Sequence, residues 1–400
     1  MSESVGQHQN PAYTVGPILN PQQALQLGHI LSQCFNVSLN HWQTYTQQLG
    51  QQNLRLVCQG NQVLGGLGVY PMGQWFGGQR ITMSGIAGLG IAPEHRGRGA
   101  ALTLVLETLK TLHQQRIPMA TLYASTSHLY RQAGFEQAGT YCQYRLPTQS
   151  LISSPSDRTL PLTTGDTNHL ELCAKLYQQQ AQQNNGNLDR HPALWEQMFD
   201  LETPVYVTLI GTEQQPEGYV IFTHQAVSGG YDLRILDLVL LTPLAIRRYW
   251  TFLADHRSLA RDILWYGAPV DPAQLLLLEQ TYQVQRTERW LMRMIDFPQA
   301  LTLRGYPQGL EAELHLEVED PQLPANSGRL ILQVAQGQGR VSSGGKGHLK
   351  LTIRGAAPLY TSLLTAEQLQ TLGFLSGPAE VLAQATTIFS GPQPWMGDHF

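Results

Sequence analysis

Charged residues are scarce in this 400-residue chain, at 14% against a usual share of about 25%. No run of Lys or Arg occurs and the net charge is −4, which argues against a nucleic-acid-binding surface. No apolar stretch approaches the roughly 20 residues that span a bilayer. Apolar residues still make up 42% of the chain, and at about 150 residues per domain its length predicts two or three domains.

Cysteine is also rare, and the four residues form no CxxC pair: Cys34, Cys58, Cys142 and Cys173. Neither a disulfide framework nor a zinc site is expected, and we expect no bound metal. The first ten residues are polar and contain no apolar signal-peptide core. These features predict reduced thiols in a cytoplasmic protein that binds neither nucleic acid nor membrane.

Acidic residues are nearly missing from the first part of the chain. Residues 1–150 hold eight basic and four acidic residues, whereas the remaining 250 hold 17 and 25. No carboxylate side chain occurs between Glu3 and Glu94. An enzyme site built in this region must therefore take a carboxylate base from elsewhere.

The apolar periodicity predicts a mixed α/β chain with three units. After a loose tail over residues 1–16, the first unit reaches residue 150, the second covers 151–296 and the third 297–400. A Ser/Pro-rich linker at 153–161 joins the first two, and Pro243 repeats the position of Pro93, which makes an internal duplication plausible. The predicted helices are 21–35, 100–113, 127–132, 169–182, 192–199, 244–256, 272–280, 358–364 and 366–372. The predicted strands are 54–59, 63–71, 80–91, 119–124, 135–146, 204–210, 218–224, 232–241, 262–266, 284–295, 311–319, 329–334 and 348–353, followed by a Gly/Pro-rich tail.

One strand–turn–helix junction carries the strongest functional signal. Its strand ends in Leu89-Gly90-Ile91, its turn is Arg96-Gly97-Arg98-Gly99 and its helix begins at Ala100-Ala101. Glycines let backbone N–H groups approach an anion, and a helix N-terminus and two arginines add positive charge. The segment predicts a pyrophosphate-binding turn, although a plain connecting turn is the alternative.

The pattern Arg96-x-x-Gly99-x-Ala101 resembles the coenzyme A signature of the GNAT N-acetyltransferases, R/Q-x-x-G-x-G/A. This resemblance implies that acetyl-CoA binds the turn as acyl donor and that its pantetheine arm pairs with Leu89–Ile91. The segment His128–Phe135 resembles the GNAT element that brings a tyrosine near the coenzyme sulfur. It implies that Tyr130 is the general acid, with Tyr123 as competing candidate and an ordinary core tyrosine as the alternative.

The whole chain resembles the Eis (enhanced intracellular survival) acetyltransferases, in which two GNAT-like mixed-sheet domains precede a sterol-carrier-like α/β domain. The resemblance implies a homohexamer in which the α-carboxylate of Phe400 enters the first domain as catalytic base, although a frayed terminus is the default for most proteins. The second unit has no glycine at the matching loop, Ile246-Arg247-Arg248-Tyr249-Trp250, so we expect no coenzyme A there.

The same resemblance suggests Phe35 and Trp42 as walls of the acceptor pocket, although both suit an ordinary core, and Asp398 and His399 as neighbours of the terminal residue. Eis proteins that acetylate aminoglycosides present acids in these regions. Here the acids are few, which puts strong binding of a multiply charged amine in doubt unless the acidic second unit supplies carboxylates.

The sequence therefore predicts an acetyl-CoA-dependent N-acetyltransferase that acts on primary amines of small molecules, aminoglycoside-like or other, by direct transfer. One alternative is transfer of a longer acyl chain, or modification of peptide lysines. Another is a non-catalytic protein that binds acyl-CoA or lipid.

Overall fold

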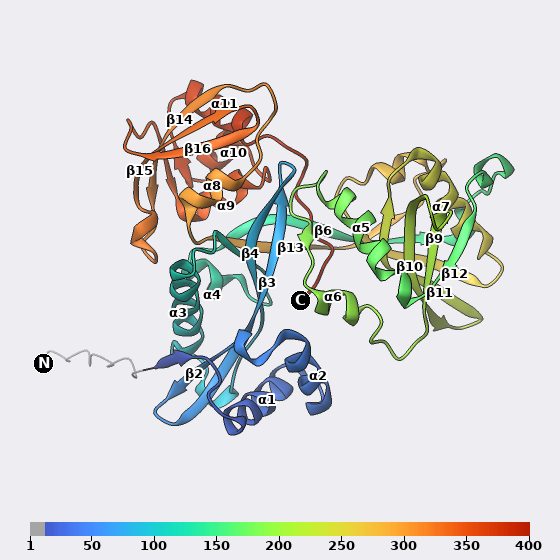
Figure 1. The fold of residues 1–400 in the computed structure, drawn as a ribbon, viewed down its shortest axis with the longest axis horizontal. Coiled ribbons are helices and arrows are strands. Elements are labelled where there is room, and N and C mark those ends of the chain that lie inside the picture. The colour runs from blue at the N-terminus through green and yellow to red at the C-terminus, as the bar shows by residue number, and fades with distance from the viewer. Residues whose placement is uncertain (1–12) are drawn as a thin grey trace, which may run out of the picture.

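The structure, a computed structural model, describes residues 13–400, and its three units meet around the C-terminus (Figure 1). The strands of the first unit are β1 (Thr14–Gly16), β2 (Leu54–Gln59), β3 (Gln62–Phe76), β4 (Gln79–Ile91), β5 (Met119–Tyr123) and β6 (Glu136–Pro147). Its helices are α1 (Pro21–Phe35), α2 (Leu39–Leu49), α3 (Ala100–Gln114) and α4 (Ser127–Gln132).

The second unit repeats the alternation of strands and helices. Its strands are β7 (Leu162–Gly165), β8 (Leu188–Asp189), β9 (Val205–Gly211), β10 (Pro216–Val227), β11 (Gly230–Leu240), β12 (Ala260–Gly267) and β13 (Gln283–Met294). Its helices are α5 (Leu170–Ala181), α6 (Pro192–Gln197) and α7 (Pro243–Asp255).

The third unit has a separate five-stranded sheet in the order β16-β15-β14-β17-β18. Its strands are β14 (Ala312–Glu319), β15 (Gly328–Ala335), β16 (Gln338–Ser343), β17 (Leu349–Thr352) and β18 (Leu375–Ser376). Its helices are α8 (Phe297–Leu303), α9 (Ile353–Tyr360), α10 (Ala366–Thr371) and α11 (Ala379–Ile388).

One continuous sheet runs through the first two units, because they exchange strands. Its order is β1-β2-β3-β4-β5-β13-β6-β12-β11-β10-β9-β7, and β8 pairs with β3. Strand β13 of the second unit lies antiparallel between β5 and β6, where Trp290 pairs with Tyr123 on one side and Gly139 on the other. Strand β6 in turn pairs with β12, for example Arg145 with Leu264. The two units therefore share backbone hydrogen bonds and are not two independent sheets.

The sheet of the first unit is covered on both faces. On one face, which we call the α1 face, Leu27 and Leu31 of α1 belong to the same core as Met72 and Met83. On the other, the α3 face, residues of α3 such as Leu104 pack into a second core. Alternating side chains of β4 and β5 point into one core or the other, as expected for a strand buried on both faces.

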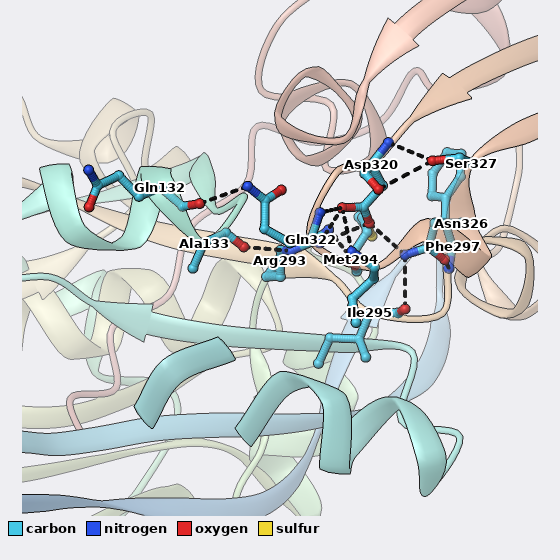
Figure 2. Close-up of polar contacts among 11 residues, drawn as sticks. Gln132, Ala133, Arg293, Met294, Ile295, Phe297, Asp320, Gln322, Asn326 and Ser327 are labelled. Atoms are coloured by element: carbon cyan, nitrogen blue, oxygen red, sulfur yellow. Dashed lines mark hydrogen bonds and ion pairs between the residues drawn. The ribbon is translucent and has the colours of Figure 1, made fainter. Parts of the chain in front are cut away.

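A buried ion pair fastens the third unit to β13, the strand of the second unit that enters the sheet of the first (Figure 2). The Arg293 Nη2 of β13 donates to both carboxylate oxygens of Asp320, at 2.7 and 2.8 Å, and both side chains are fully buried. Asn326 also donates to Asp320, at 2.8 Å, and to the Ile295 carbonyl, at 3.0 Å. Every charge in this cluster is thus compensated, which a buried ion pair requires.

Four predictions of secondary structure need correction. The predicted tail includes Thr14–Gly16, which form β1 against β2; its first twelve residues lie outside the described part of the chain. The predicted helix 272–280 is only a short 3₁₀ turn, Pro272–Leu276, because most of its leucines do not enter the core, Leu275 being 83% and Leu278 76% exposed. The predicted helix 358–364 is α9, which starts earlier because Thr352 caps its N-terminus.

The predicted Gly/Pro-rich tail contains α11. Its buried face, Leu382, Ala385 and Ile388, has helical spacing. The predicted ranges also omit helices α2 and α8 and strands β7, β8, β16 and β18. No helix of the described residues is long and apolar enough to cross a membrane.

Candidate active site

The site begins where two parallel strands of the first unit part. Strands β4 and β5 pair at three positions, the last of which joins Gly85 to Thr121. Beyond it, β4 continues to Ile91 with β3 on its other side, and β5 continues to Tyr123 with β13 on its other side. Among the described residues no strand pairs with the facing edges of β4 and β5 past this point. The result is a wedge-shaped gap lined by backbone groups, which we call the β4–β5 gap.

A bulge in β4 lies beside this gap. Gly68 pairs with Ala87 and Gly66 pairs with Gly90, so Gly88 and Leu89 together oppose a single residue of β3. Gly88 has φ +58°, a conformation that favours glycine. A bulge leaves the backbone of its extra residue unpaired, so we expect a free backbone group here.

The glycine turn that follows β4 leaves most of its backbone N–H groups without a partner in the described part of the chain. Gly97 and Gly99 have φ +74° and +89°, and helix α3 starts after Gly99 without a side-chain cap. Within residues 13–400, the N–H groups of Gly97, Arg98 and Gly99 make no hydrogen bond. The Tyr13 hydroxyl donates to the Arg98 carbonyl at 2.9 Å, and Arg96 Nε donates to the Ile91 carbonyl at 2.9 Å. Free donors at a helix N-terminus with no acidic residue in its first turn suit a bound anion.

Tyr130 lies in the core of the α3 face, on the short helix α4. It is 7% exposed, its ring centroid is 5.7 Å from that of Phe135, and burial raises the pKa of its hydroxyl to about 12. In the described part of the chain this hydroxyl has no hydrogen-bond partner, so its proton is available to a ligand. A tyrosine with this pKa keeps that proton throughout the physiological range.

The second and third units together hold the end of the helix that carries Tyr130, as Figure 2 shows. Arg293 Nε donates to the Ala133 carbonyl at 2.9 Å, and Gln322 Nε2 donates to the Gln132 carbonyl at 2.9 Å. Gly134, at φ +87°, leaves room for the Arg293 side chain, because a Cβ there would lie 2.8 Å from Nε. The orphan carbonyls at the end of α4 are thus satisfied by side chains of other units.

The last ten residues run back from the third unit to the first as an extended segment, which we call the C-terminal tail. Asn185 Nδ2 donates to the Pro392 carbonyl at 3.2 Å, and Asn187 Nδ2 donates to the Trp395 carbonyl at 2.9 Å. Met396 is fully buried, and its carbonyl accepts a hydrogen bond from the Tyr123 hydroxyl. Tyr123, the competing candidate for the acid, is therefore already bonded to the tail.

The Asp398 carboxylate forms hydrogen bonds with side chains of the second unit. Arg190 Nε donates to Asp398 Oδ1 at 2.8 Å, and the Tyr177 hydroxyl donates to Oδ2 at 3.1 Å. The other guanidinium nitrogens of Arg190 donate to both oxygens of Asp237 at 2.7 and 2.8 Å. Burial raises the pKa of Asp398, although Arg190 opposes this. The carboxylate fastens the tail to the second unit, and its part in substrate binding stays a prediction.

Phe400 reaches the start of the β4–β5 gap. A Cβ on Gly85 would lie 2.6 Å from its ring, so only glycine fits beneath Phe400. The ring centroid of Tyr70 is 6.0 Å away, and Met72 lies beside the same position. Gly85 is the last residue of β4 that pairs with β5. Phe400 packs on it with the core of the α1 face, whereas Tyr130 belongs to the core of the α3 face.

His399 lies in an aromatic and acidic cluster beside the gap. Its ring stacks on Tyr123, with centroids 4.1 Å apart, and Nε2 forms a hydrogen bond with the Tyr141 hydroxyl. Glu288 Oε2 is 3.6 Å from the same nitrogen, and Glu288 pairs with Tyr141 across β13 and β6. Burial lowers the pKa of His399, against the opposing effect of Glu288, so the imidazole is neutral at pH 7. The strand exchange thus supplies a carboxylate that the first unit lacks.

The two predicted pocket aromatics occupy different environments. Phe35, at the end of α1, is 47% exposed, whereas Trp42 is 7% exposed and lies directly against Gly28 of α1. Tyr45, which the sequence did not suggest, stacks on Trp42 at 5.7 Å and brings its hydroxyl against Gly68 at the bulge. That hydroxyl is buried and has no partner among residues 13–400.

The second unit differs at the matching positions. Helix α7 follows β11 without an intervening glycine turn, and Thr242 Oγ1 accepts from the Ala245 N–H at 3.1 Å. The residues predicted to form its loop, 246–250, lie inside α7. Strands β11 and β12 also part, but here the Gln180 side chain accepts from the Leu240 N–H and donates to the Leu238 carbonyl, at 3.3 and 3.4 Å. In the second unit the Gln180 side chain thus hydrogen-bonds to backbone groups of β11 whose counterparts in the first unit are left free.

Four residues near the site were not found by reading the sequence: Tyr45, Tyr70, Arg190 and Glu288. None lies in a local motif, and each reaches the site through contacts between distant segments. Only the missing carboxylates of the first unit signalled that acidic groups must come from elsewhere.

Comparisons with known proteins identify the three units. Residues 19–138 and 186–294 match models of the acetyltransferase (GNAT) domain, and residues 297–397 match the sterol carrier protein domain. A GCN5-related N-acetyltransferase of known structure from Anabaena variabilis is 44% identical, with a TM-score of 0.94 over 97% of this chain and 100% of that one.

Two further relatives are more distant. An uncharacterized N-acetyltransferase of Streptomyces griseus is 26% identical over 349 residues, 81% of this chain and 83% of that protein. The N-acetyltransferase Eis of Mycobacterium tuberculosis is 26% identical over 288 residues, 65% of each protein. The chain therefore belongs to the GCN5-related N-acetyltransferases, as an Eis-like enzyme with two GNAT domains and a sterol-carrier-like domain.

Proposed function

We propose that this acetyltransferase moves an acetyl group directly from acetyl-CoA to a primary amine of a small molecule. The observation that carries the proposal is that two side chains lie on opposite faces of the sheet that contains the β4–β5 gap. Tyr130, with a free hydroxyl, belongs to the α3 face, and Phe400 lies on the α1 face. An acid and a base on opposite sides of a gap suit a reaction that needs both.

The donor would bind at free backbone groups. The N–H groups of Gly97 to Gly99 and the N-terminus of α3 suit the pyrophosphate, and Arg98 adds an exposed positive charge. The edge of β4 at Leu89 and Gly90 suits the amide groups of the pantetheine arm, which would pair with it like an added strand. At Ile91 the carbonyl already accepts from Arg96 Nε.

The proposed reaction begins when the neutral amine attacks the thioester carbonyl. A C–N bond forms, the C–S bond breaks, and N–H groups at the bulge stabilise the negative oxygen of the tetrahedral intermediate. The Tyr130 hydroxyl gives its proton to the departing sulfur, and the α-carboxylate of Phe400 accepts the amine proton through a water molecule. One proton leaves the nitrogen and one reaches the sulfur, so the step balances.

The acceptor side combines aromatic walls with few free acids. The exposed ring of Phe35 offers apolar surface. Glu288, beside His399, brings a carboxylate from the second unit, although Arg286 already pairs with it at 2.7 Å. Because Asp398 is already bonded to Arg190, we infer an acceptor with few positive charges.

The Eis likeness further suggests a homohexamer, which sedimentation equilibrium can measure.

The test is a thiol-release assay with acetyl-CoA and a panel of aminoglycosides, polyamines and lysine peptides. A protein extended by two glycines after Phe400 should bind coenzyme A normally but lose nearly all kcat, because the carboxylate moves. Gly85→Ala should act similarly, since its Cβ displaces the Phe400 ring, whereas Gly16→Ala, with nothing within 4 Å of its Cβ, is the matched control. Unchanged kcat in the extended protein contradicts the proposed base.

A further inference from the structure

The second unit contains a cavity of about 500 Å³ that plays no part in the proposed reaction. Its walls come from β11 and β12 beyond their last paired residues, from helices α5 and α7, and from the C-terminal tail. Trp395, Gly397 and Asp398 form the tail side, whereas His399 and Phe400 do not line it. The volume lies within the range of about 300–1,000 Å³ typical of small-molecule sites.

The charged groups of the cavity wall are unbalanced. Asp237, Asp271 and Asp398 line it together with a single cation, Arg190. Arg190 is already bonded to Asp237 and Asp398. Asp271 Oδ1 accepts from the Ala273 N–H at 2.9 Å, and in the described chain this carboxylate has no ion-pair partner. The wall therefore carries excess negative charge, which favours a cation.

Further groups of the wall suit an ammonium ion. Asn187 is 2% exposed, lines the cavity, and its Oδ1 has no hydrogen-bond partner among residues 13–400. A buried acceptor without a donor is unfavourable, and a ligand N–H would satisfy it. The aromatic side chains of Trp265, Tyr266 and Trp395 also line the cavity, and aromatic faces attract organic cations.

We propose that this cavity is a second binding site, for a small organic ammonium ion with an apolar or aromatic body. It differs from the acceptor site, because Phe400 packs on Gly85 and Tyr70 and does not line the cavity. A pantetheine arm is disfavoured there, because Gln180 occupies the backbone groups of β11. Since Asp398 and Trp395 form one wall, an occupied cavity favours the tail position that holds Phe400 at the β4–β5 gap.

The probe is N,N-dimethylbenzylamine, whose protonated form is an aromatic ammonium ion. As a neutral tertiary amine it has no N–H that acetylation can replace, so binding is measured without turnover. Isothermal titration of the full chain should give saturable binding. Asp271→Asn, which changes charge but hardly any volume, should weaken it by at least about tenfold.

Gly267→Leu should abolish binding by filling the cavity. A Cβ at Gly267 meets its nearest atoms at 3.5 Å, an ordinary contact, so the backbone tolerates the change. Asp200→Asn, an exposed carboxylate of the same unit, and Phe35→Ala, on the acceptor side, should leave the Kd unchanged. Thermal melting checks that each variant is folded. If Gly267→Leu does not fold, the Kd of Asp271→Asn alone decides the test. No saturable binding by the original protein, or the same Kd in Asp271→Asn, overturns the proposal.

Discussion

Single residues of the first unit divide into those that hold the tail and those left free for a ligand. The Tyr123 hydroxyl is bonded to Met396, and the Tyr141 hydroxyl to His399. The Tyr130 hydroxyl has no such bond within the described residues, and burial is the cause of its raised pKa. This difference in bonding separates the proposed acid from its neighbours.

Replacing Tyr130 by Phe is expected to lower kcat by about 10²–10⁴, the usual contribution of a positioned acid, with little change in coenzyme A affinity. Tyr206→Phe, on the exposed surface of the second unit, is the control. Because burial raises the pKa of Tyr130 to about 12, its acidic form persists above pH 10. The pH profile of kcat should therefore show no decline near the ordinary tyrosine pKa of about 10. A full loss of kcat in Tyr123→Phe, with Tyr130→Phe active, would reverse the assignment.

At the scale of elements, helix α4 depends on another unit for its stability. Its last carbonyls accept from Arg293 and Gln322, and Arg293 in turn depends on Asp320. A short helix with few internal hydrogen bonds is marginal alone, so these contacts keep Tyr130 in position.

Asp320→Asn should destabilise the protein by about 3–5 kcal/mol, because it leaves Arg293 buried without a compensating charge. Urea unfolding followed by circular dichroism measures the change. Glu107→Gln, which breaks the exposed pair with Lys110, should cost about 0–1 kcal/mol and is the control. Equal effects of the two substitutions would show that the buried cluster does not hold the units together.

The elements that the sequence predicted best are those set by local signals. Helix 21–35 has the predicted bounds because Asn20 caps it and its apolar residues are regularly spaced. The glycine turn and helix 127–132 are equally local. The position of β13 between β5 and β6 was not predictable, because strand pairing joins residues more than a hundred positions apart. For the same reason Glu288 and Arg190, which reach the site from the second unit, were missed.

At the scale of the whole molecule, Glu136 joins the first and third units. It is 4% exposed and accepts from Arg131 of α4, at 2.8 Å, and from Arg354 of α9. Burial would raise its pKa, but the hydrogen bonds from the two arginines hold it below the ordinary value. The stabilisation is therefore complete above the ordinary glutamate pKa of about 4.3 and is lost as the pH falls through the lowered value.

Glu136→Gln should accordingly be less stable than the original protein at pH 7, and the difference should shrink on acidification below about pH 4. The melting temperature of both proteins, measured from pH 7 to pH 3, tests this. Parallel profiles over the whole range would mean that Glu136 is not the group that titrates.

The strand exchange also has a consequence for synthesis on the ribosome. When residue 150 has emerged, the first domain still lacks the strand that must enter between β5 and β6, since β13 ends at Met294. At roughly 5–20 residues per second, about seven to thirty seconds pass before that strand is made. Until then the nascent first domain exposes two open strand edges, and it is a natural client for a chaperone.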